Sequence, residues 1–176
     1  GGHVDLAIAV GPAGSDTVPP LAVTRPTQVV LGGRFGTMNG DTQHGIAAVD
    51  ATSGATRPFV VGDPTEYLRN NGTTSAVTSV TTDGVNVYVS AYNFGGAGYL
   101  EGTLIAEADG GDLVLVNDCR GDSYAAYQMN GVMYVASHTH NCEMIGGSIE
   151  QFPRVEKRAT AFTITPTTRV RPHAET

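Results

Sequence analysis

Two acidic residues and two histidines lie close to the chain's two cysteines, and their types could bind a metal ion. They are Asp118, Asp122, His138 and His140, and Glu143 follows shortly after them. Carboxylates and imidazoles are common ligands of zinc and related divalent cations. Histidines two positions apart on one strand point to the same face. The cluster therefore predicts either a divalent-metal site or a structural set, in which the histidines only hydrogen-bond to backbone carbonyls.

Two other motifs in this stretch give weaker chemical hypotheses. Ser123, His138 and Asp122 have the residue types of a hydrolase triad, but the sequence lacks the Gly-x-Ser-x-Gly turn that would present the serine. Arg120-Gly121-Asp122 spells an integrin-type adhesion tripeptide, a match short enough to arise by chance. The sequence also has no phosphate-binding loop and no dinucleotide-binding fingerprint.

Three aromatic residues flank a glycine-rich loop and form a second candidate binding region. The loop Gly95–Gly98 is preceded by Tyr92 and Phe94 and followed by Tyr99. Exposed aromatic rings can stack on the face of a sugar. The same residues would equally serve to pack neighbouring sheets together. The sequence leaves both interpretations open.

The two cysteines allow one disulfide. Cys119 and Cys142 are separated by a hairpin pattern, whose strands could bring them together. Only 15% of the residues are charged and 23 are glycine, which favours an extracellular protein with the disulfide formed. The alternative is a pair of reduced thiols in a cytosolic protein.

The elements expected to position these residues are short strands joined by tight turns. Asn130-Gly131, between Tyr124–Gln128 and Val132–Ser137, is a strong hairpin signal. Leu113–Val116 is a continuous apolar run, typical of a strand buried on both faces. The prolines of Gly11–Pro26 predict a loop or an irregular edge. Further strands are predicted at Val4–Val10, Val29–Gly32, Ile46–Val49, Phe59–Val61, Val77–Val80, Val85–Ser90, Leu104–Ala106, Ala159–Ile164 and from Arg169 onward. No stretch has sustained helical periodicity, so we predict an all-β chain.

Composition limits the partners. The 176 residues are enough for one domain with a hydrophobic core. Ten Lys and Arg against seventeen Asp and Glu give a net charge of −7, which argues against nucleic acid or an anionic membrane surface as partner. No apolar run approaches the length of a membrane span, so we expect no membrane insertion.

One strand pattern recurs three times along the chain. The three copies centre on Val30, Tyr88 and Tyr134, and each precedes a second strand with a turn. The spacings are 58 residues from Val30 to Tyr88 and 46 from Tyr88 to Tyr134. The second spacing is typical of a β-propeller blade, at about 40–50 residues. The repeat predicts three to four four-stranded antiparallel β-propeller blades; a β-sandwich with regular hairpins is the alternative.

The first unit resembles the strand–loop–strand repeat of secreted actinobacterial β-propellers. In that group a cysteine after Asn-Asp is followed by Gly-Asp-Ser-Tyr and later by Ser-His-x-His-x-Cys, which correspond here to residues 117–119, 121–124 and 137–142. Arg120 stands where this group leads us to expect a histidine. The resemblance covers roughly Gln28–Ile164. In the first unit it depends on Gly32, Gly33, Phe35, Asn39, Gly40, Ile46, Ala47, Asp50 and Gly54.

The resemblance implies a bacterial, secreted or cell-surface protein and gives no established activity. We expect a partial blade and proline-rich loop in residues 1–28, followed by propeller blades in 29–176, within one domain. Since an ordinary ring has six or seven blades, the expected partners are the remainder of a larger propeller chain or neighbouring subunits. The function expected is a structural or binding module whose loops bind protein or glycan, including within a cell-surface or virion attachment assembly. The alternative is a metal-assisted hydrolase or lyase that uses Asp118, His138 and His140.

Overall fold

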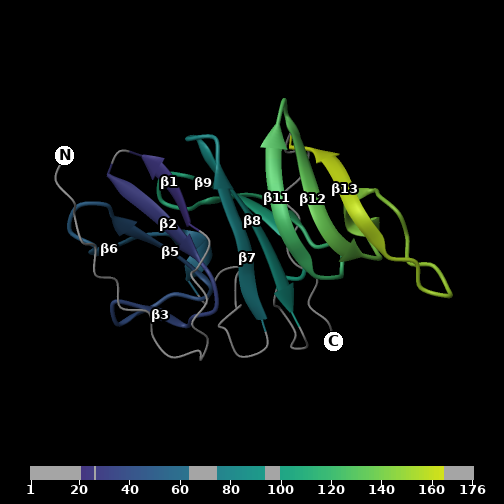
Figure 1. Cartoon of the computed structure of the whole chain (residues 1–176), viewed down its shortest axis with the longest axis horizontal. Helices are drawn as coiled ribbons and strands as arrows, with labels where there is room; N and C mark the ends of the chain where they lie inside the picture. Colours follow the sequence, from purple (N-terminus) through teal and green to yellow (C-terminus); the bar gives the residue numbers. More distant parts are fainter. Residues whose placement is uncertain (1–20, 26, 64–74, 94–99, 165–176) are drawn as a thin grey trace.

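The computed structural model describes residues 21–25, 27–63, 75–93 and 100–164, and this part of the chain consists of β-strands with two short 3-10 helices (Figure 1). The predicted all-β class is confirmed. Within these ranges the sheets close into neither a barrel nor a propeller. Among the same residues there is no helix with the length and apolar character that a membrane crossing requires.

Three antiparallel sheets follow one another along the chain, and in each the strands pair in sequence order. The first sheet contains β1 (Leu21–Arg25), β2 (Gln28–Gly32), β5 (Ile46–Asp50) and β6 (Thr56–Arg57). The second contains β7 (Ser75–Thr82), β8 (Asn86–Asn93), β9 (Thr103–Glu107) and β10 (Leu113–Asn117). The third contains β11 (Ser123–Met129), β12 (Val132–Thr139) and β13 (Lys157–Thr163). The remaining elements are the hairpin of β3 (Thr37–Met38) and β4 (Asp41–Thr42), and the 3-10 helices η1 (Val60–Gly62) and η2 (Glu143–Ile145).

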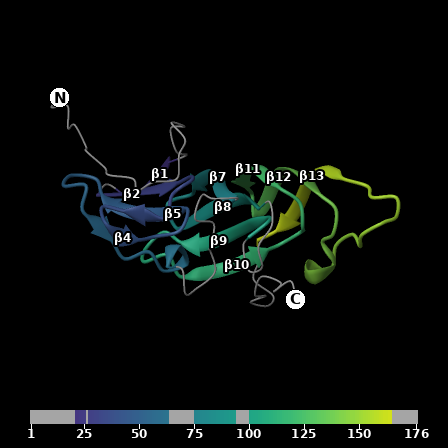
Figure 2. The ribbon, with the colours of Figure 1, turned by 90° about the horizontal axis from the view of Figure 1, so that it is seen from below.

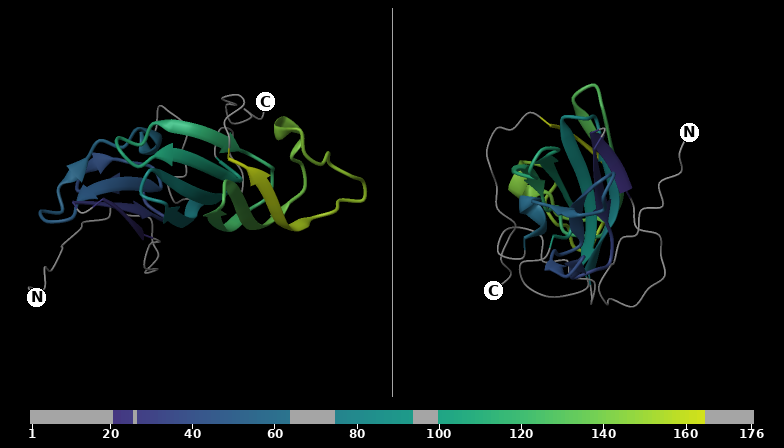
Figure 3. Two further views of the ribbon diagram at one scale, coloured as in Figure 1. Left: turned by 90° about the horizontal axis from the view of Figure 1, so that it is seen from above. Right: turned by 90° about the vertical axis from the view of Figure 1, so that its left-hand side faces the viewer.

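The second sheet lies between the other two. Strand β7 contacts β1 and β2 on one side and β11 on the other. Figures 2 and 3 show the same order along the molecule, from the first sheet in purple and blue, through the second in teal, to the third in green and yellow. Sheets that are adjacent in sequence are therefore adjacent in space.

Local turn chemistry explains two of the hairpins. Asn130 and Gly131 join β11 to β12, and both have positive φ, at 53° and 76°. Asn39 and Gly40 join β3 to β4 in the same way, at 51° and 92°. Asparagine and glycine tolerate this conformation better than other residues, and two such residues in succession give the turn that matches the twist of paired strands. The hairpin predicted at Asn130-Gly131 is confirmed.

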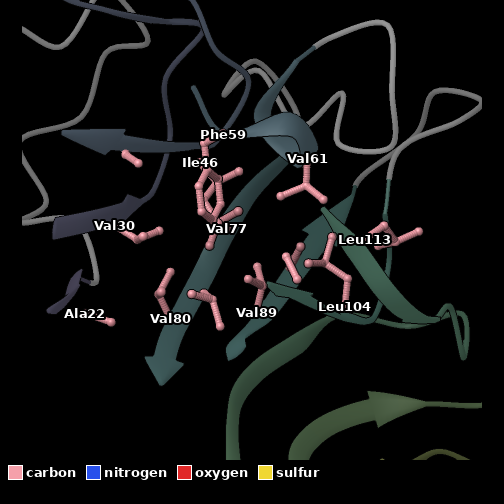
Figure 4. Close-up of a cluster of buried hydrophobic side chains, with 14 of the residues drawn as sticks. Ala22, Val30, Ile46, Phe59, Val61, Val77, Val80, Val89, Leu104 and Leu113 are labelled. Atoms are coloured by element: carbon pink, nitrogen blue, oxygen red, sulfur yellow. The ribbon is translucent and has the colours of Figure 1, made fainter. Parts of the chain in front are cut away.

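Two apolar clusters hold the sheets together. The cluster between the first and second sheets is the larger one, and Figure 4 shows Val30 and Phe59 on one side of it with Val89 and Leu104 on the other. The cluster between the second and third sheets contains Tyr88, Ile105, Ala126, Met133 and Val135. Residues on β8 alternate between them, since successive side chains of a strand point to opposite faces. Strand β8 of the second sheet is thus buried on both faces.

The first sheet has a cover of its own on the face turned away from the second sheet. There Leu31 and Val49 pack with Phe35 and Met38, which belong to the segment between β2 and β5. The inserted hairpin β3–β4 therefore closes this end of the stack.

The repeat in the sequence has a structural counterpart. Val30, Tyr88 and Tyr134 all lie in the second strand of their sheets. Each pairs with a residue of the third strand, and these partners are Ala48, Ile105 and Ala161 respectively. In each sheet the repeated residue therefore lies in the second strand and pairs with the third.

Two strand predictions were wrong in detail. Leu113–Val116 is not buried on both faces, because β10 is the edge strand of its sheet. Val114 and Leu115 are only half-buried. The strand predicted at Phe59–Val61 is largely the 3-10 helix η1, and β6 ends before it. The Val60 and Val61 N–H groups donate to the Gly110 and Gly111 carbonyls, so this apolar segment pairs with a turn of the second sheet instead of extending its own sheet.

The proline-rich stretch is partly described. Its residues Leu21–Arg25 form the edge strand β1, whose pairing shifts register between Val23 and Arg25, which agrees with the irregular edge predicted there. The strands predicted at Val4–Val10 and beyond Ile164, with most of the loop from Gly11, lie outside the described residues.

Candidate functional site

The predicted disulfide is present and lies where the second sheet joins the third. Cys119 follows β10 and Cys142 follows β12, and both are buried. The bond closes a loop with a sequence separation of 23 residues, which in the chain-entropy model stabilises the fold by about 3 kcal/mol. It ties the end of the second sheet to the end of the β11–β12 hairpin.

Backbone hydrogen bonds continue the β11–β12 hairpin toward the disulfide and position the polar residues beside it. The His138 N–H donates to the Asp122 carbonyl at 3.0 Å, the His140 N–H to Arg120 at 2.9 Å, and the Asn141 N–H to Cys119 at 3.0 Å. Asp122 therefore lies opposite His138 across the hairpin.

Three potential metal ligands converge at this point. Glu101, Asp122 and His138 each offer one ligand atom, and these atoms all lie within 4.8 Å of one another. Glu101 lies two residues before β9 of the second sheet, whereas Asp122 immediately precedes β11 and His138 lies in β12 of the third sheet. The His138 Nε2 and the Asp122 Oδ2 are 3.6 Å apart. We call these three residues the Glu101 group.

Asp122 is the most deeply buried member of the group. It is 4% exposed, and burial raises the pKa of its carboxyl, against the opposing effects of the His138 charge and a backbone hydrogen bond from Asn93. Its Oδ1 is buried with no hydrogen-bond partner among the described residues. A buried carboxylate oxygen without such a partner costs free energy.

His138 is held from its other side by an aromatic residue. The Tyr124 hydroxyl and the His138 Nδ1 are 3.3 Å apart, and the two rings meet edge to face with centroids 5.8 Å apart. This contact occupies Nδ1, so Nε2 is the nitrogen turned toward Asp122. The arrangement leaves one defined imidazole nitrogen for the group.

The predicted four-residue cluster is therefore divided. Asp122 and His138 are brought together, whereas Asp118 and His140 are not part of the Glu101 group. His140 Nδ1 instead lies 3.2 Å from the Glu150 Oε1, and burial lowers the pKa of this histidine. The expectation that the two histidines share a face does not apply, because β12 ends at Thr139 after a register shift that begins at Ala136.

Sequence analysis missed Glu101. It lies 21 positions before Asp122, on the segment that leads into β9 of the second sheet, and no local motif marks it. Glu143, the acidic residue noted beside the cluster, is exposed and stands outside the Glu101 group. Only the packing of the second sheet on the third brings Glu101 to the site.

The weaker motifs do not form the sites they suggest. In Arg120-Gly121-Asp122 the last two residues are buried, so the tripeptide is not presented as an adhesion loop. The Ser123 hydroxyl is buried and has no hydrogen-bond partner among the described residues, so the hydrolase triad is not assembled.

One of the three candidate stacking aromatics is described. Tyr92 is half-buried at the end of β8, where the Arg34 guanidinium donates a hydrogen bond to its hydroxyl. The guanidinium carbon lies 5.7 Å from the ring centroid, within range of a cation–π contact. Phe94 and Tyr99 lie outside the described residues.

A second surface carries exposed aromatic residues that sequence analysis did not single out as a site. Tyr127 and Tyr134 pair directly across β11 and β12, and they are 64% and 47% exposed. They lie on the face of the third sheet that points away from the second sheet. Alternation along the strands gives this outer face Ala125, Tyr127, Met129, Tyr134, Ala136, Ala159 and Ala161, all of which are exposed.

Comparison with protein families, with curated proteins and with solved structures finds no match to this chain. The function proposed below is therefore inferred from the fold, the Glu101 group and the outer face of the third sheet.

Proposed function

We propose that the chain is a propeller-type scaffold of a secreted or cell-surface protein, whose stacked sheets hold loops that bind protein or glycan. Three consecutive antiparallel sheets support this proposal, each with the repeated residue in its second strand. The disulfide and the low content of charged residues support an extracellular location. Loops held on a rigid scaffold are common binding sites.

One observation carries the scaffold proposal. Val30 and Tyr88 are both almost completely buried, and each lies in the cluster formed with the next sheet along the chain. Tyr134 holds the equivalent position in the third sheet and is 47% exposed. The outer face of the third sheet is thus the counterpart of two faces that are covered.

The occupant we infer for this face is a further antiparallel sheet of the same repeat. It would continue the stacking already present between the second and third sheets, with Tyr127, Met129 and Tyr134 as apolar anchors. The opposite end of the stack is closed by Phe35 and Met38, so a head-to-tail stack of two copies of this chain would have to displace that cover.

Tyrosine nitration with peptide mapping tests this proposal. In the 176-residue chain alone, we expect tetranitromethane to modify Tyr134 and to spare Tyr88. In the complete protein isolated from its source, we expect Tyr134 to be protected while the exposed Tyr124 still reacts. Equal reactivity of Tyr134 in both samples would overturn the proposal. Protection that appears in the 176-residue chain with rising concentration, together with a dimeric mass, would identify a second copy as the occupant and also contradict it.

A metal-assisted hydrolase or lyase is the second candidate function. The Glu101 group favours it, because three protein ligands leave a coordination position open for water or substrate, as in catalytic zinc sites. The predicted hydrolase or lyase uses Asp118, His138 and His140. The Glu101 group keeps His138 of these three and has Asp122 and Glu101 in place of the other two. Hydrolysis of model esters or glycosides that requires added metal and is lost in Asp122→Asn would place this candidate ahead of the scaffold.

A further inference from the structure

We propose that Glu101, Asp122 and His138 form a binding site for a divalent cation of the zinc class. The site does not depend on the scaffold function, because it is built inside the junction of the second and third sheets. Its basis is that ligand atoms from three separate segments lie within 4.8 Å of one another. Two carboxylate oxygens and one imidazole nitrogen form a ligand set that zinc accepts readily.

The burial of Asp122 is an independent indication of a ligand. The carboxylate is 4% exposed, and its Oδ1 has no hydrogen-bond partner in the described residues. Its Oδ2 lies 3.6 Å from the His138 Nε2, which is too long for a hydrogen bond. Buried carboxylates are normally paired closely or coordinate a metal. The Asn93 backbone N–H donates to this carboxylate, and a cation between Asp122, Glu101 and His138 would supply the interaction that Oδ1 lacks.

The surroundings of His138 match those of a metal ligand. Histidine ligands commonly hydrogen-bond through the nitrogen that does not bind the metal, which fixes the orientation of the ring. Here the Tyr124 hydroxyl contacts Nδ1 and leaves Nε2 facing Asp122. The backbone hydrogen bond from His138 to Asp122 fixes the distance between the two segments.

The type of ion follows from the ligands. Magnesium and calcium prefer sites made entirely of oxygen ligands, whereas a nitrogen ligand favours zinc and its transition-metal neighbours. With three protein ligands, a tetrahedral ion keeps one position for water or for an oxygen of a bound molecule. The net charge of −7 also favours attraction of a cation to the protein.

His140 provides a matched control. It lies two positions from His138 and close to the same disulfide, but it faces Glu150 and is outside the Glu101 group. If zinc bound to histidines merely because they lie near the surface, His140→Gln would lower the zinc affinity as strongly as His138→Gln.

Calorimetric titration of the chelator-treated chain with zinc chloride tests the site. We expect one zinc ion per chain in the wild type and in His140→Gln. We expect the affinity to fall at least about tenfold in His138→Gln and in Asp122→Asn, because each removes one ligand. Magnesium chloride in excess is expected not to displace the zinc.

A second measurement requires no variant. In the wild-type chain, zinc is expected to shift the imidazole resonances of His138 and to leave those of His140 in place. The proposal is overturned if the wild type binds no stoichiometric zinc, or if binding depends on His140 and not on His138. The absence of zinc binding would not contradict the scaffold proposal, which the nitration experiment tests. A negative nitration result would likewise not contradict the zinc site.

Discussion

The second and third sheets contain the same repeated strand, yet they differ in what lies over it. Tyr88 of the second sheet is 1% exposed because the third sheet packs over it, whereas Tyr134 of the third sheet is 47% exposed. Both tyrosines occupy the second strand and pair with the third strand of their sheets. The sequence pattern thus determines the strand and its register, and the neighbouring sheet determines whether the residue belongs to the core.

The largest expected difference between the two sheets is in stability. Tyr88→Ala should lower the free energy of unfolding by about 3–5 kcal/mol, because it leaves a cavity between the second and third sheets. Tyr134→Ala should lower it by about 1 kcal/mol or less, because about half of the side chain is exposed and only the cross-strand contact with Tyr127 is lost. Urea unfolding followed by fluorescence or circular dichroism measures both. Similar losses in the two variants would show that the outer face of the third sheet is packed after all.

The turns of the two sheets allow a second comparison. Gly111 in the β9–β10 turn and Gly131 in the β11–β12 turn have nearly equal φ values of 75° and 76°. A Cβ added at Gly111 would lie 2.7 Å from the Phe59 ring, whereas at Gly131 it would meet nothing within 4 Å. Gly131→Ala should therefore cost only the backbone strain, about 1 kcal/mol.

Gly111→Ala should cost about 2–4 kcal/mol, since it must also displace Phe59 from the core between the first and second sheets. Thermal unfolding of the two variants under the same conditions measures the difference. If both lose the same stability, the turn of the second sheet is not held against Phe59 as the structure describes.

Much of the fold could be predicted because its signals are local. Asn130-Gly131 determines a turn by its own backbone preferences, and the repeat around Val30, Tyr88 and Tyr134 reflects alternation within single strands. The burial of Leu113–Val116 could not be predicted in this way. An apolar run does not reveal that β10 is an edge strand, which depends on the order of the whole sheet.

The candidate site shows the same limit. Asp122 and His138 were predictable as neighbours because one hairpin holds both. Glu101 was not, because only the packing of one sheet on another brings it near. His140 was wrongly grouped with His138 because the alternation of side chains was extended past the end of β12.

The smallest expected effect concerns alkaline pH and the covered tyrosine of the second sheet, Tyr88. Burial, together with the hydrogen bond that the Tyr88 hydroxyl donates to Asp83, raises the pKa of Tyr88 to about 12. The folded state therefore keeps a proton that the unfolded state loses near pH 10, and stability falls as the pH rises between these values.

From about pH 9.5 to about pH 11, Tyr88 alone should remove about 1 kcal/mol of stability. Urea midpoints across this range, compared between wild type and Tyr88→Phe, isolate its share from that of the other titrating groups. The Tyr88→Phe variant should show the shallower decline, because it has no buried hydroxyl to ionise. If instead the decline is as steep in Tyr88→Phe as in the wild type, the Tyr88 hydroxyl is not buried between the second and third sheets as the structure describes.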